Sequence, residues 1–427
     1  LGRVQTDRAV TLGEDGCATN HPFPKHRSMN KDTSWLPFWE DFSVVDLRVG
    51  EASVQIELAP SSDATLRCGR CLQPAGVHEK LRRQVRDMPI LGHEVSLDVE
   101  LYRVACPSCG GCLQHVPWLD KHARLTQRLA RAAAQCCSRM PVLHVAQMFA
   151  LHWSTVRRLD KSRLQTIVDQ APAAQPRRLI MDEFALFKGH RYASVILDAD
   201  TRRVLYVAEG RSRAAVRPFF ESLGPQGCER IEAVAMDMNS AFDLEVRHFC
   251  RQARVVYDLF HVVAKFGRDV ISRVRVDAAN QLRKDKPARR VVKQAHWLLL
   301  RNPANLDEHQ RIRLADVLQA NQALMTVYLM KESLKHLWSA PSAWEWRRRW
   351  KQWHAHAQES GIAPLEHFAR CLRNYWRGIV SRVRWPMHTG QLEGINNRIK
   401  VIKRMAYGYR DTDYFFLKIK AAFPGNA

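Results

Sequence analysis

Alternating apolar and polar residues predict a β-rich module in the first third of the chain. Residues 43–58 alternate in two consecutive stretches, and strict alternation places successive side chains on opposite faces of a strand, so we expect a β-hairpin there. Residues 95–101 alternate in the same way and predict a further strand. We expect this module to occupy residues 35–120, after an extension at residues 1–34 that we expect to be poorly ordered.

The periodicity becomes helical after this module. Apolar residues recur at helical spacing from residue 124 to about residue 168, with a break at Met140-Pro141. The run 170–176 is rich in Ala, Gln and Pro, a composition that is typical of a linker. We therefore expect residues 121–170 to form a separate helical domain.

Beyond the linker, strand-like apolar runs come first and then alternate with helical periodicity. The predicted strands lie at residues 179–184, 192–198, 204–208, 231–237 and 254–259, and the predicted helices at 213–223 and 241–252. Antiparallel strands followed by alternating strands and helices predict a mixed sheet with helices packed on it. Residues 261–384 are helical in pattern, and a final helix is predicted at residues 390–404.

The composition adds a polyanionic partner to this picture. The chain has 427 residues, of which 46% are hydrophobic, so we expect several domains with real cores. Its formal net charge is +23, and a surplus of Lys and Arg favours nucleic acid because each phosphate contact releases counterions. A membrane surface is the alternative polyanion, but the sequence has no apolar run long enough to span a bilayer.

The cysteines predict a metal site in a reducing compartment. The chain has 11 Cys, an odd number, and no recognisable signal peptide, so we expect a protein of the reducing cytosol. Cys68 and Cys71 form one CxxC pair and Cys106 and Cys109 form a second, and four thiolates can hold one structural zinc ion in a tetrahedron. The alternative ligands are Cys112, which could replace Cys109, and His78, His93 and His115.

Residues 144–161 have the pattern of a helix-turn-helix. The pattern predicts a helix at 144–150, a tight turn at 151–153 and a second helix that begins with Ser154 as its N-cap. With its apolar residues turned inward, this second helix would present polar residues to DNA, namely Thr155, Arg157, Arg158 and Lys161. The alternative is an ordinary helical hairpin.

Acidic residues within apolar strands indicate a second kind of metal site. Asp182 lies inside one predicted strand and Asp237 ends another. Burying a carboxylate inside an apolar strand costs free energy unless the carboxylate is paired or bound to a cation. Two carboxylates on neighbouring strands also repel each other. Oxygen ligands of this type suit magnesium or manganese. Three competing acids rank lower, namely Glu183, Asp243 and Asp258.

The predicted final helix has one polar and one apolar stripe. The polar stripe consists of Glu393, Asn397, Lys400 and Arg404, and the apolar stripe of Leu392, Ile395, Ile399 and Ile402. We expect the apolar stripe to pack on the sheet, so that Glu393 joins Asp182 and Asp237 around two metal ions. Asn397, Lys400 and Arg404 would then lie close by to receive DNA phosphates, and the alternative is a solvated charged face.

Four blocks of sequence, in this order, resemble the signature blocks of the ISL3 family of insertion-sequence transposases. They are Met181-Asp-Glu-Phe-Ala-Leu-Phe-Lys-Gly-His-Arg-Tyr192, Ala235-Met-Asp-Met-Asn239, Tyr257-Asp-Leu-Phe-His261 and Gly390-Gln-Leu-Glu-Gly-Ile-Asn-Asn-Arg-Ile-Lys400. The tail Lys403-Arg-Met-Ala-Tyr-Gly-Tyr409 is similar as well. The resemblance covers most of the chain from about residue 35.

The resemblance implies an RNase H-like core in which Asp182, Asp237 and Glu393 are the DDE residues, with Asp258 and His261 as a D-x-x-H element near the site. The expected fold class is multidomain α+β: a β-rich zinc-binding module, a helix-turn-helix, and an RNase H-like α/β catalytic core with a mostly α-helical insertion. The expected parts of the core are residues 171–265, the insertion 266–385 and the last helix and tail at 386–427.

The predicted insertion combines tryptophan with basic residues. Its tryptophans are Trp297, Trp338, Trp344, Trp346, Trp350, Trp353 and Trp376, and the interleaved cations are Arg347, Arg348, Arg349 and Lys351. Most of these rings are expected in the core, and one or two could stack on a flipped or unpaired base.

The combined prediction is a DDE transposase that needs two magnesium or manganese ions and one structural zinc ion. It would bind terminal inverted repeats in double-stranded DNA, cleave the ends by hydrolysis and join the 3′-hydroxyls to target DNA. Because two ends must be held together, we expect a homodimer or a larger assembly on DNA. The alternatives are an inactive or domesticated sequence-specific DNA-binding regulator and an RNase H-like nuclease that acts on other nucleic acids.

Overall fold

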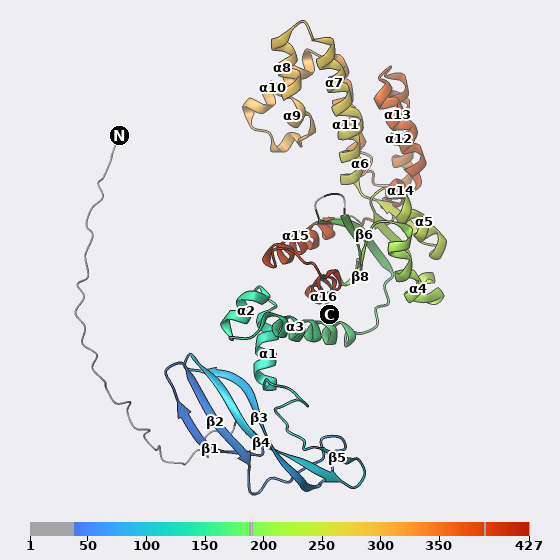
Figure 1. Cartoon of the computed structure of the whole chain (residues 1–427). Helices are drawn as coiled ribbons and strands as arrows, with labels where there is room; N and C mark the ends of the chain where they lie inside the picture. The colour runs from blue at the N-terminus through green and yellow to red at the C-terminus, as the bar shows by residue number, and fades with distance from the viewer. Residues whose placement is uncertain (1–37, 188, 190, 388–389, 427) are drawn as a thin grey trace, which may run out of the picture. The chain divides into compact units, whose positions relative to one another are not determined.

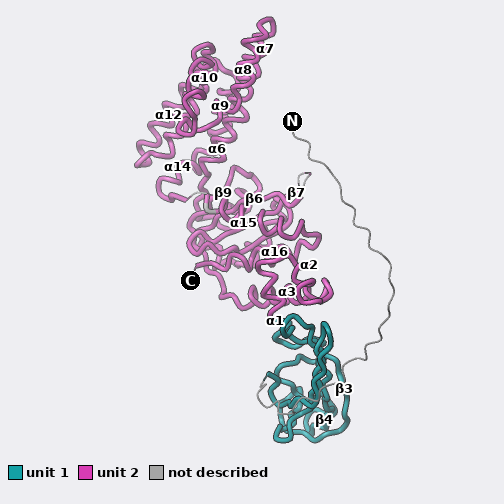
Figure 2. The backbone as a smooth tube through the Cα atoms, turned by 90° about the vertical axis from the view of Figure 1, so that its left-hand side faces the viewer, with its two compact units in different colours: residues 1–131 teal, residues 132–427 magenta. Residues whose placement is uncertain are grey.

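The computed structural model describes residues 38–187, 189, 191–387 and 390–426. The extension expected at residues 1–34 lies outside the described residues. The chain divides into two compact units, Leu1–Arg131 and Ala132–Ala427, which Figure 2 shows in different colours. Among the described residues, none of the helices has the length and apolar character needed to cross a membrane.

The first unit is built on a five-stranded sheet in the order β1-β2-β4-β3, with β5 paired to β4. Its strands are β1 (Phe42–Val49), β2 (Ser53–Pro60), β3 (Gly76–Ile90), β4 (His93–Cys106) and β5 (Gly110–Leu113). The expected hairpin is confirmed, because β1 and β2 pair antiparallel. The apolar residues that alternate along β2 and β4 form the buried core of this unit, with Ile56, Leu58 and Leu97 almost fully covered.

The helical segment that follows has the expected break. Helix α1 (Gln127–Cys136) ends before Met140-Pro141, and α2 (Val142–Met148) and α3 (Trp153–Asp169) come after it. Pro141 precedes α2 because proline can occupy a helix start, where its missing N–H leaves no hydrogen bond unmade. Val145, Val156 and Leu164 are buried, as an amphipathic pair of helices requires.

A second five-stranded sheet forms the centre of the second unit (Figure 1), in the order β10-β9-β6-β7-β8. Its strands are β6 (Arg178–Phe187), β7 (Arg191–Asp198), β8 (Val204–Glu209), β9 (Ala233–Met236) and β10 (Arg254–Tyr257). Strands β6, β7 and β8 pair antiparallel, whereas β9 is parallel to both β6 and β10. The expected mixed sheet is therefore confirmed.

Helices bury both faces of this sheet. On one face, Leu179, Met181 and Met236 pack with α4 (Arg213–Glu229) and α5 (Ser240–Phe249). On the other face, apolar side chains of the sheet pack against α15 (Gly390–Met405) and α16 (Thr412–Ala422). The apolar stripe of α15 is buried as expected, because Leu392, Ile395 and Ile399 belong to this second core.

Helix α16 is an element that the periodicity analysis missed, since the predicted helices ended near residue 404. Its sequence, Thr-Asp-Tyr-Phe-Phe-Leu-Lys-Ile-Lys-Ala-Ala, is short and is apolar on more than one side. The helix contacts both β8 and α3, so its two faces are covered by different elements. A single helical stripe is therefore absent from its sequence.

The segment between the last strand and α15 is helical, as predicted. Its elements are α6 (Leu259–Phe266), η1 (Gly267–Ile271), α7 (Ser272–Gln281), α8 (Lys286–Gln294), α9 (His296–Leu300), η2 (Pro303–Asn305), α10 (Glu308–Gln319), α11 (Gln322–Lys335), α12 (Ala343–Glu359), α13 (Ala363–Leu372), η3 (Arg373–Tyr375), α14 (Trp376–Val380) and η4 (Ser381–Val383). Trp346 and Trp353 on α12 are buried, and Trp353 Nε1 donates to the carbonyl of Met330 at 2.9 Å.

Candidate active site and zinc centre

Two CxxC turns of the first unit meet at one point. The Sγ atoms of Cys68, Cys71, Cys106 and Cys109 all lie within 4.8 Å of one another, the arrangement that a tetrahedral zinc site needs. Backbone N–H groups of the first turn, above all that of Cys71, lower the pKa of the Cys68 thiol to about 6, which favours the thiolate that binds zinc. The donor set therefore fits one structural zinc ion.

Packing around the first CxxC turn explains its glycine. A Cβ atom on Gly69 would come within 2.4 Å of the carbonyl oxygen of Leu113, so a larger residue would push β5 away. Cys112 is buried beside the cluster, with its Sγ 3.3 Å from that of Cys68, but it is not part of the four-thiol group. Among the described residues, none of the histidines joins this group either.

The turn between α2 and α3 is built differently from the prediction. The N-cap of α3 is His152, not Ser154, and its Nδ1 accepts a hydrogen bond from the Ser154 backbone N–H at 3.3 Å. The Ser154 hydroxyl also lies 2.7 Å from this Nδ1 atom. The N-cap of α3 therefore lies two residues earlier than expected, because an imidazole nitrogen can cap a helix as a side-chain oxygen does.

The four residues of α3 that were expected to face outward differ in their surroundings. Arg158 is exposed and Thr155 is half-buried. Arg157 and Lys161 instead form ion pairs with Asp411, the N-cap of α16, and Arg157 also lies over the rings of Trp153 and Tyr414. Periodicity placed all four residues on the outward face of α3 but could not show that α16 covers part of that face.

Three aspartates form a row across the central sheet. Ile180 on β6 and Val256 on β10 both pair with Ala235 on β9. Asp182, Asp258 and Asp237 each follow two residues later, so they lie side by side on one face. This is the face covered by α15, because Ile180, Ala235 and Val256 belong to the core that α15 completes.

Burial and mutual repulsion both raise the pKa of two of these carboxyl groups. Burial raises the pKa of Asp182 above its ordinary value, and nearby Asp258 adds to the rise. Burial also raises the pKa of Asp237 to about 6, with further increases from Glu183 and Asp182. His261 on α6 opposes both shifts, so its imidazole lies close enough to interact with both carboxylates.

Helix α15 contacts this row through Asn396. Asn396 Nδ2 donates to Asp182 Oδ2 at 2.9 Å. Asn397, which the helical pattern had placed near the site, is exposed, as are Lys400 and Arg404. Glu393 lies one turn before Asn396 and is exposed as well. The structure thus brings Asp182, Asp237, Asp258 and His261 together and leaves the carboxylate of Glu393 facing solvent.

The oxygen atoms of the row fit a hard divalent cation. Asp237 Oδ1 and Asn396 Oδ1 are buried and have no hydrogen-bond partner among the described residues. A buried carboxylate oxygen without a partner is costly unless a proton or a cation compensates for it. Within the described ranges, however, the cysteine cluster is the only group of three or more candidate ligands whose atoms lie within 4.8 Å of one another. The acids are therefore not gathered into a compact set.

Comparison with known proteins assigns a family to this arrangement. The model of the ISL3 transposase domain, described as "Transposase", matches residues 179–419. The helix-turn-helix domain of transposase family ISL3 matches residues 114–164, and the zinc-finger of transposase IS204/IS1001/IS1096/IS1165 matches residues 64–109.

The chain belongs to the ISL3 family of transposases.

Two relatives resemble this ISL3 transposase over most of its length. The transposase for insertion sequence element IS1001 of Bordetella parapertussis is 50% identical over 397 residues, which cover 91% of this chain and 97% of that protein. The transposase for insertion sequence element IS1557 of Mycobacterium tuberculosis is 28% identical over 385 residues, or 84% of this chain and 86% of that protein. The protein is therefore a DDE-type DNA transposase of an insertion sequence, and its helix-turn-helix is a DNA-binding domain.

Sequence reasoning missed two contacts of this ISL3 transposase. Asn396 was missed because only the residues four, seven and eleven positions after Glu393 were assigned to its stripe. Its proximity to Asp182 follows from the position of α15 on the sheet. Asp411 was missed because its partners, Arg157 and Lys161, are distant in sequence.

Proposed function

We propose that this transposase binds the terminal inverted repeats of its element, cleaves their ends by two-metal hydrolysis and joins the 3′-hydroxyls to target DNA. Asp182, Asp237 and Glu393 would hold two magnesium or manganese ions. The observation that carries the proposal is the row of carboxylates on the sheet face that α15 covers, with Asp182 bonded to that helix through Asn396.

The order of the central sheet supports an RNase H-like core. Three antiparallel strands come first in the chain, and two parallel strands are then added beside the first of them, β6. The first acid therefore comes from the strand at the centre of the sheet and the second from its neighbour. An α-helix that carries the last acid and packs on the same face agrees with such a core.

Residues of the chain orient the acids of this site and set their protonation. Asn396 holds one oxygen of Asp182 and so restricts the rotation of that carboxylate. The two ions, once bound, would activate a water or a 3′-hydroxyl and stabilise the leaving oxygen. Burial, together with the repulsion between the carboxylates, raises the pKa of Asp182 and of Asp237, and bound cations would favour the charged form of both acids.

Glu393 would act as the third acid from α15. It lies on the exposed side of the first turn of this helix, one turn before the residue that touches Asp182. Lys400 and Arg404 follow on the same exposed stripe, where they would receive DNA phosphates. Asp258 and His261 would adjust the charge of the other two acids and are assigned no separate chemical step.

Recognition of the ends would fall to α3 and the surfaces beside it. Arg158 is exposed and Thr155 half-buried at the start of this helix, where a recognition helix meets the major groove. Arg157 and Lys161 would exchange Asp411 for phosphates when DNA binds. Because both ends must be cut and joined together, the working form would be a homodimer or a larger assembly on the DNA.

The decisive experiment replaces Asp182 by Asn, which keeps the shape of the side chain and removes its charge. Cleavage of DNA that carries the element's own ends should be abolished in magnesium, while binding to those ends should remain close to wild type. The matched control is Asp200→Asn, the same change at an exposed ion pair with Arg178, which should keep most of the cleavage activity. Retained cleavage by Asp182→Asn would remove this residue from the mechanism.

The wild-type protein tests the alternative functions in the same assay. Specific binding to the ends without metal-dependent cleavage would identify a DNA-binding regulator. Cleavage of RNA–DNA hybrids in preference to the element's ends would identify an RNase H-like nuclease.

A further inference from the structure

A pocket in the helical insertion is lined by tryptophans and cations. It has a volume of about 560 Å³, and its wall consists of Trp344, Trp346, Trp350 and Trp376 together with Arg347, Arg348, Lys351 and Arg373. Pockets of this size, about 300–1,000 Å³, are typical of sites that take a small organic group. Carboxylates are absent from this wall, so the pocket suits an anionic ligand with a flat apolar part.

Three of the four indoles form a stacked floor. The rings of Trp346 and Trp350 lie 5.4 Å apart with an interplanar angle of 13°, and Trp376 from α14 lies 6.3 Å from Trp346. Trp346 is 1% exposed, and its buried Nε1–H has no acceptor among the described residues. A buried N–H without an acceptor is costly, and a ligand oxygen would remove that cost.

A rim of charged and aromatic side chains surrounds this floor. Trp344 is 70% exposed, and the guanidinium of Arg348 lies 5.8 Å from the centre of its ring. Arg347, Lys351 and Arg373 are exposed and show no hydrogen bond or ion pair to any described residue. An exposed tryptophan gains no free energy from burial in the core. An indole that lies beside cations is typical of a binding surface.

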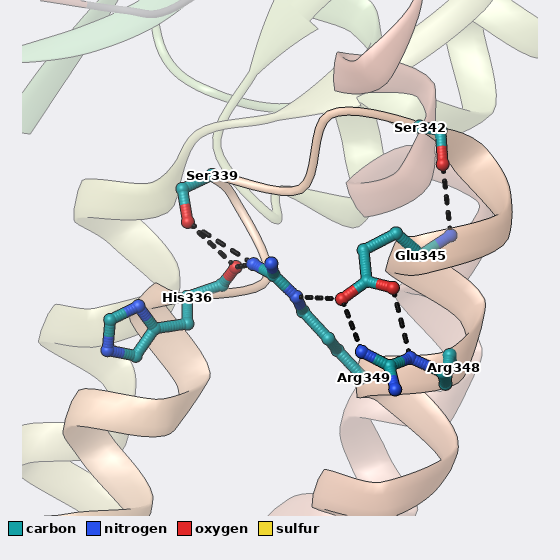
Figure 3. A network of polar contacts seen from close by, with 6 residues as sticks. All are labelled: His336, Ser339, Ser342, Glu345, Arg348 and Arg349. Carbon is teal, nitrogen blue, oxygen red and sulfur yellow. Dashed lines mark hydrogen bonds and ion pairs between the residues drawn. The ribbon is translucent and has the colours of Figure 1, made fainter.

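A polar network holds the rim in position (Figure 3). The Ser342 side chain accepts from the Glu345 N–H at 3.1 Å and begins α12, and the Glu345 carboxylate holds Arg348 and Arg349. Arg349 also donates to the carbonyl of His336 at 2.7 Å, which ties α12 to the end of α11. The Glu345 carboxylate is thus used to orient Arg348 and Arg349, and no described ion pair joins it to Arg347 or Lys351.

We propose that this pocket binds an unpaired nucleotide of the DNA substrate, with the base against the indoles and its phosphates at the surrounding cations. Only an unpaired base offers a free ring face, since the bases of a duplex stack on one another. The carboxylates of an acidic peptide would pair with the cations but would offer no flat apolar face to the four indole rings. This inference rests on the proposed function, because cleavage of the two strands at offset positions near an end would leave a short unpaired extension.

The test compares two exposed tryptophans in the full-length protein. Trp344 lines the pocket, and Trp297 on α9 is equally exposed at 70% but lies outside it. Fluorescence anisotropy would measure binding to a labelled duplex that carries the element's end with a short single-stranded extension, and to the same duplex with blunt ends. Wild-type protein should prefer the extended duplex.

Trp344→Ala should bind the extended duplex about tenfold more weakly, which is within the loss expected when one base loses an aromatic partner. Its binding to the blunt duplex should not change, and Trp297→Ala should match wild type on both probes. Trp344→Phe should restore most of the preference, which separates lost stacking from a folding defect. Arg347→Glu combined with Lys351→Glu should also weaken binding to the extended duplex.

Three outcomes would overturn the pocket assignment. They are an absent preference for the extended duplex in the wild type, an equal effect of Trp344→Ala and Trp297→Ala, and competition by poly-glutamate as strong as that of single-stranded DNA. The last outcome would identify an acidic protein as the ligand. Binding to the blunt duplex and metal-dependent cleavage test the proposed function separately, so its failure would be distinguishable.

Discussion

At the scale of single residues, the position of each acid along its strand decides which side of the sheet it faces. Asp182 follows Ile180 by two residues, and Asp237 follows Ala235 in the same way, so both face α15. Glu183 is one residue further along and has the opposite orientation, where it pairs with Arg211. Asp182 and Glu183 are neighbours in sequence, yet only Asp182 lies in the row of aspartates.

Asn396 and Asn397 offer a matched pair for testing the contact between α15 and the acids. Asn396→Ala removes the hydrogen bond to Asp182, so we expect strand cleavage to fall by about ten- to a hundredfold, as for the loss of an outer partner of a metal ligand. Asn397→Ala changes an exposed side chain and should leave the rate near that of wild type. Equal rates for the two variants would contradict a positioning role for Asn396. A stronger magnesium requirement in Asn396→Ala would support it.

In the first unit, Asp87 is a buried anion that joins three segments. It is 1% exposed, and its carboxylate accepts hydrogen bonds from Trp39 Nε1 at 2.9 Å, Thr126 Oγ1 at 2.6 Å and Arg128 Nε at 2.7 Å. Burial alone would raise the pKa of Asp87, but the hydrogen bonds from Arg128, Thr126 and the Met88 N–H outweigh it and hold the pKa below its usual value. The folded state therefore binds this proton less readily than the unfolded state.

This depressed pKa predicts how acid affects the first unit. The ionised Asp87 carboxylate stabilises the folded state fully at pH values above its unfolded pKa of about 3.9. This stabilisation is lost as the pH falls through the lower pKa of the folded state. Asp87→Asn should lower the free energy of unfolding at neutral pH by about 3 kcal/mol and flatten its dependence on pH in the acid range. Urea unfolding at several pH values would measure both effects. Asp46→Asn, at an exposed ion pair with Arg48, is the control and should change little.

At the scale of elements, α16 holds α3, the second helix of the helix-turn-helix, against the central sheet. It packs on β8, and from its other side Tyr414 donates to the buried Asp160 of α3 at 2.5 Å while Lys418 pairs with the same carboxylate at 2.7 Å. Asp411 caps the start of α16 and also pairs with two cations of α3. One short helix therefore positions α3 and neutralises part of its charge.

Asp411→Asn separates these two roles, because asparagine caps a helix as well as aspartate does but carries no charge. Arg157 and Lys161 would then be free to meet phosphates. We expect tighter DNA binding at low salt and a slope of log K against log salt that is steeper by about one to two. Asp413→Asn in the same first turn is exposed and is the control. A slope unchanged by Asp411→Asn would show that these cations do not reach the DNA.

At the scale of the whole molecule, the chain consists of two units with separate cores. The first contains the four-cysteine cluster and a β-sheet core, and the second contains the helix-turn-helix, the central sheet and the helical insertion. The cysteine cluster joins the turn after β2 to the end of β4 and the turn that follows it. Loss of its metal would therefore loosen the first unit, while the core of the second unit contains none of the ligands.

Chelation should consequently affect the two units differently. Removing zinc should abolish the cooperative unfolding of the first unit and leave the transition of the second unit in place, as differential scanning calorimetry would show. Cys106→Ser should lower the bound zinc from about one ion per chain to none. Cys112→Ser is the control, because Cys112 lies beside the cluster but outside the four-thiol group, and it should retain zinc. Loss of zinc in both variants would show that Cys112 is a ligand.

Much of this architecture was predictable from local pattern. Alternation identified β1, β2 and β4, and helical spacing identified α2, α3 and α15 with their buried stripes. The two CxxC pairs identified the four cysteines that meet in one cluster, since a two-residue spacer brings two thiols together within one turn. The aspartates in apolar strands were recognisable because burying a carboxylate costs free energy unless a hydrogen bond, an ion pair or a metal ion compensates for it.

The tertiary structure decided which distant segments meet. Periodicity reports which side of an element is buried, but it carries no information about the element that covers it. For this reason Asn396 was not distinguished from Asn397, Asp411 was not connected with Arg157, and α16 was not expected at all. By itself, the sequence determined most of the elements, the four cysteines that cluster and the kind of chemistry. The packing of α15 and α16 on the sheet determined which side chains surround the acids and which cations remain free, because those contacts join residues that are far apart in the chain.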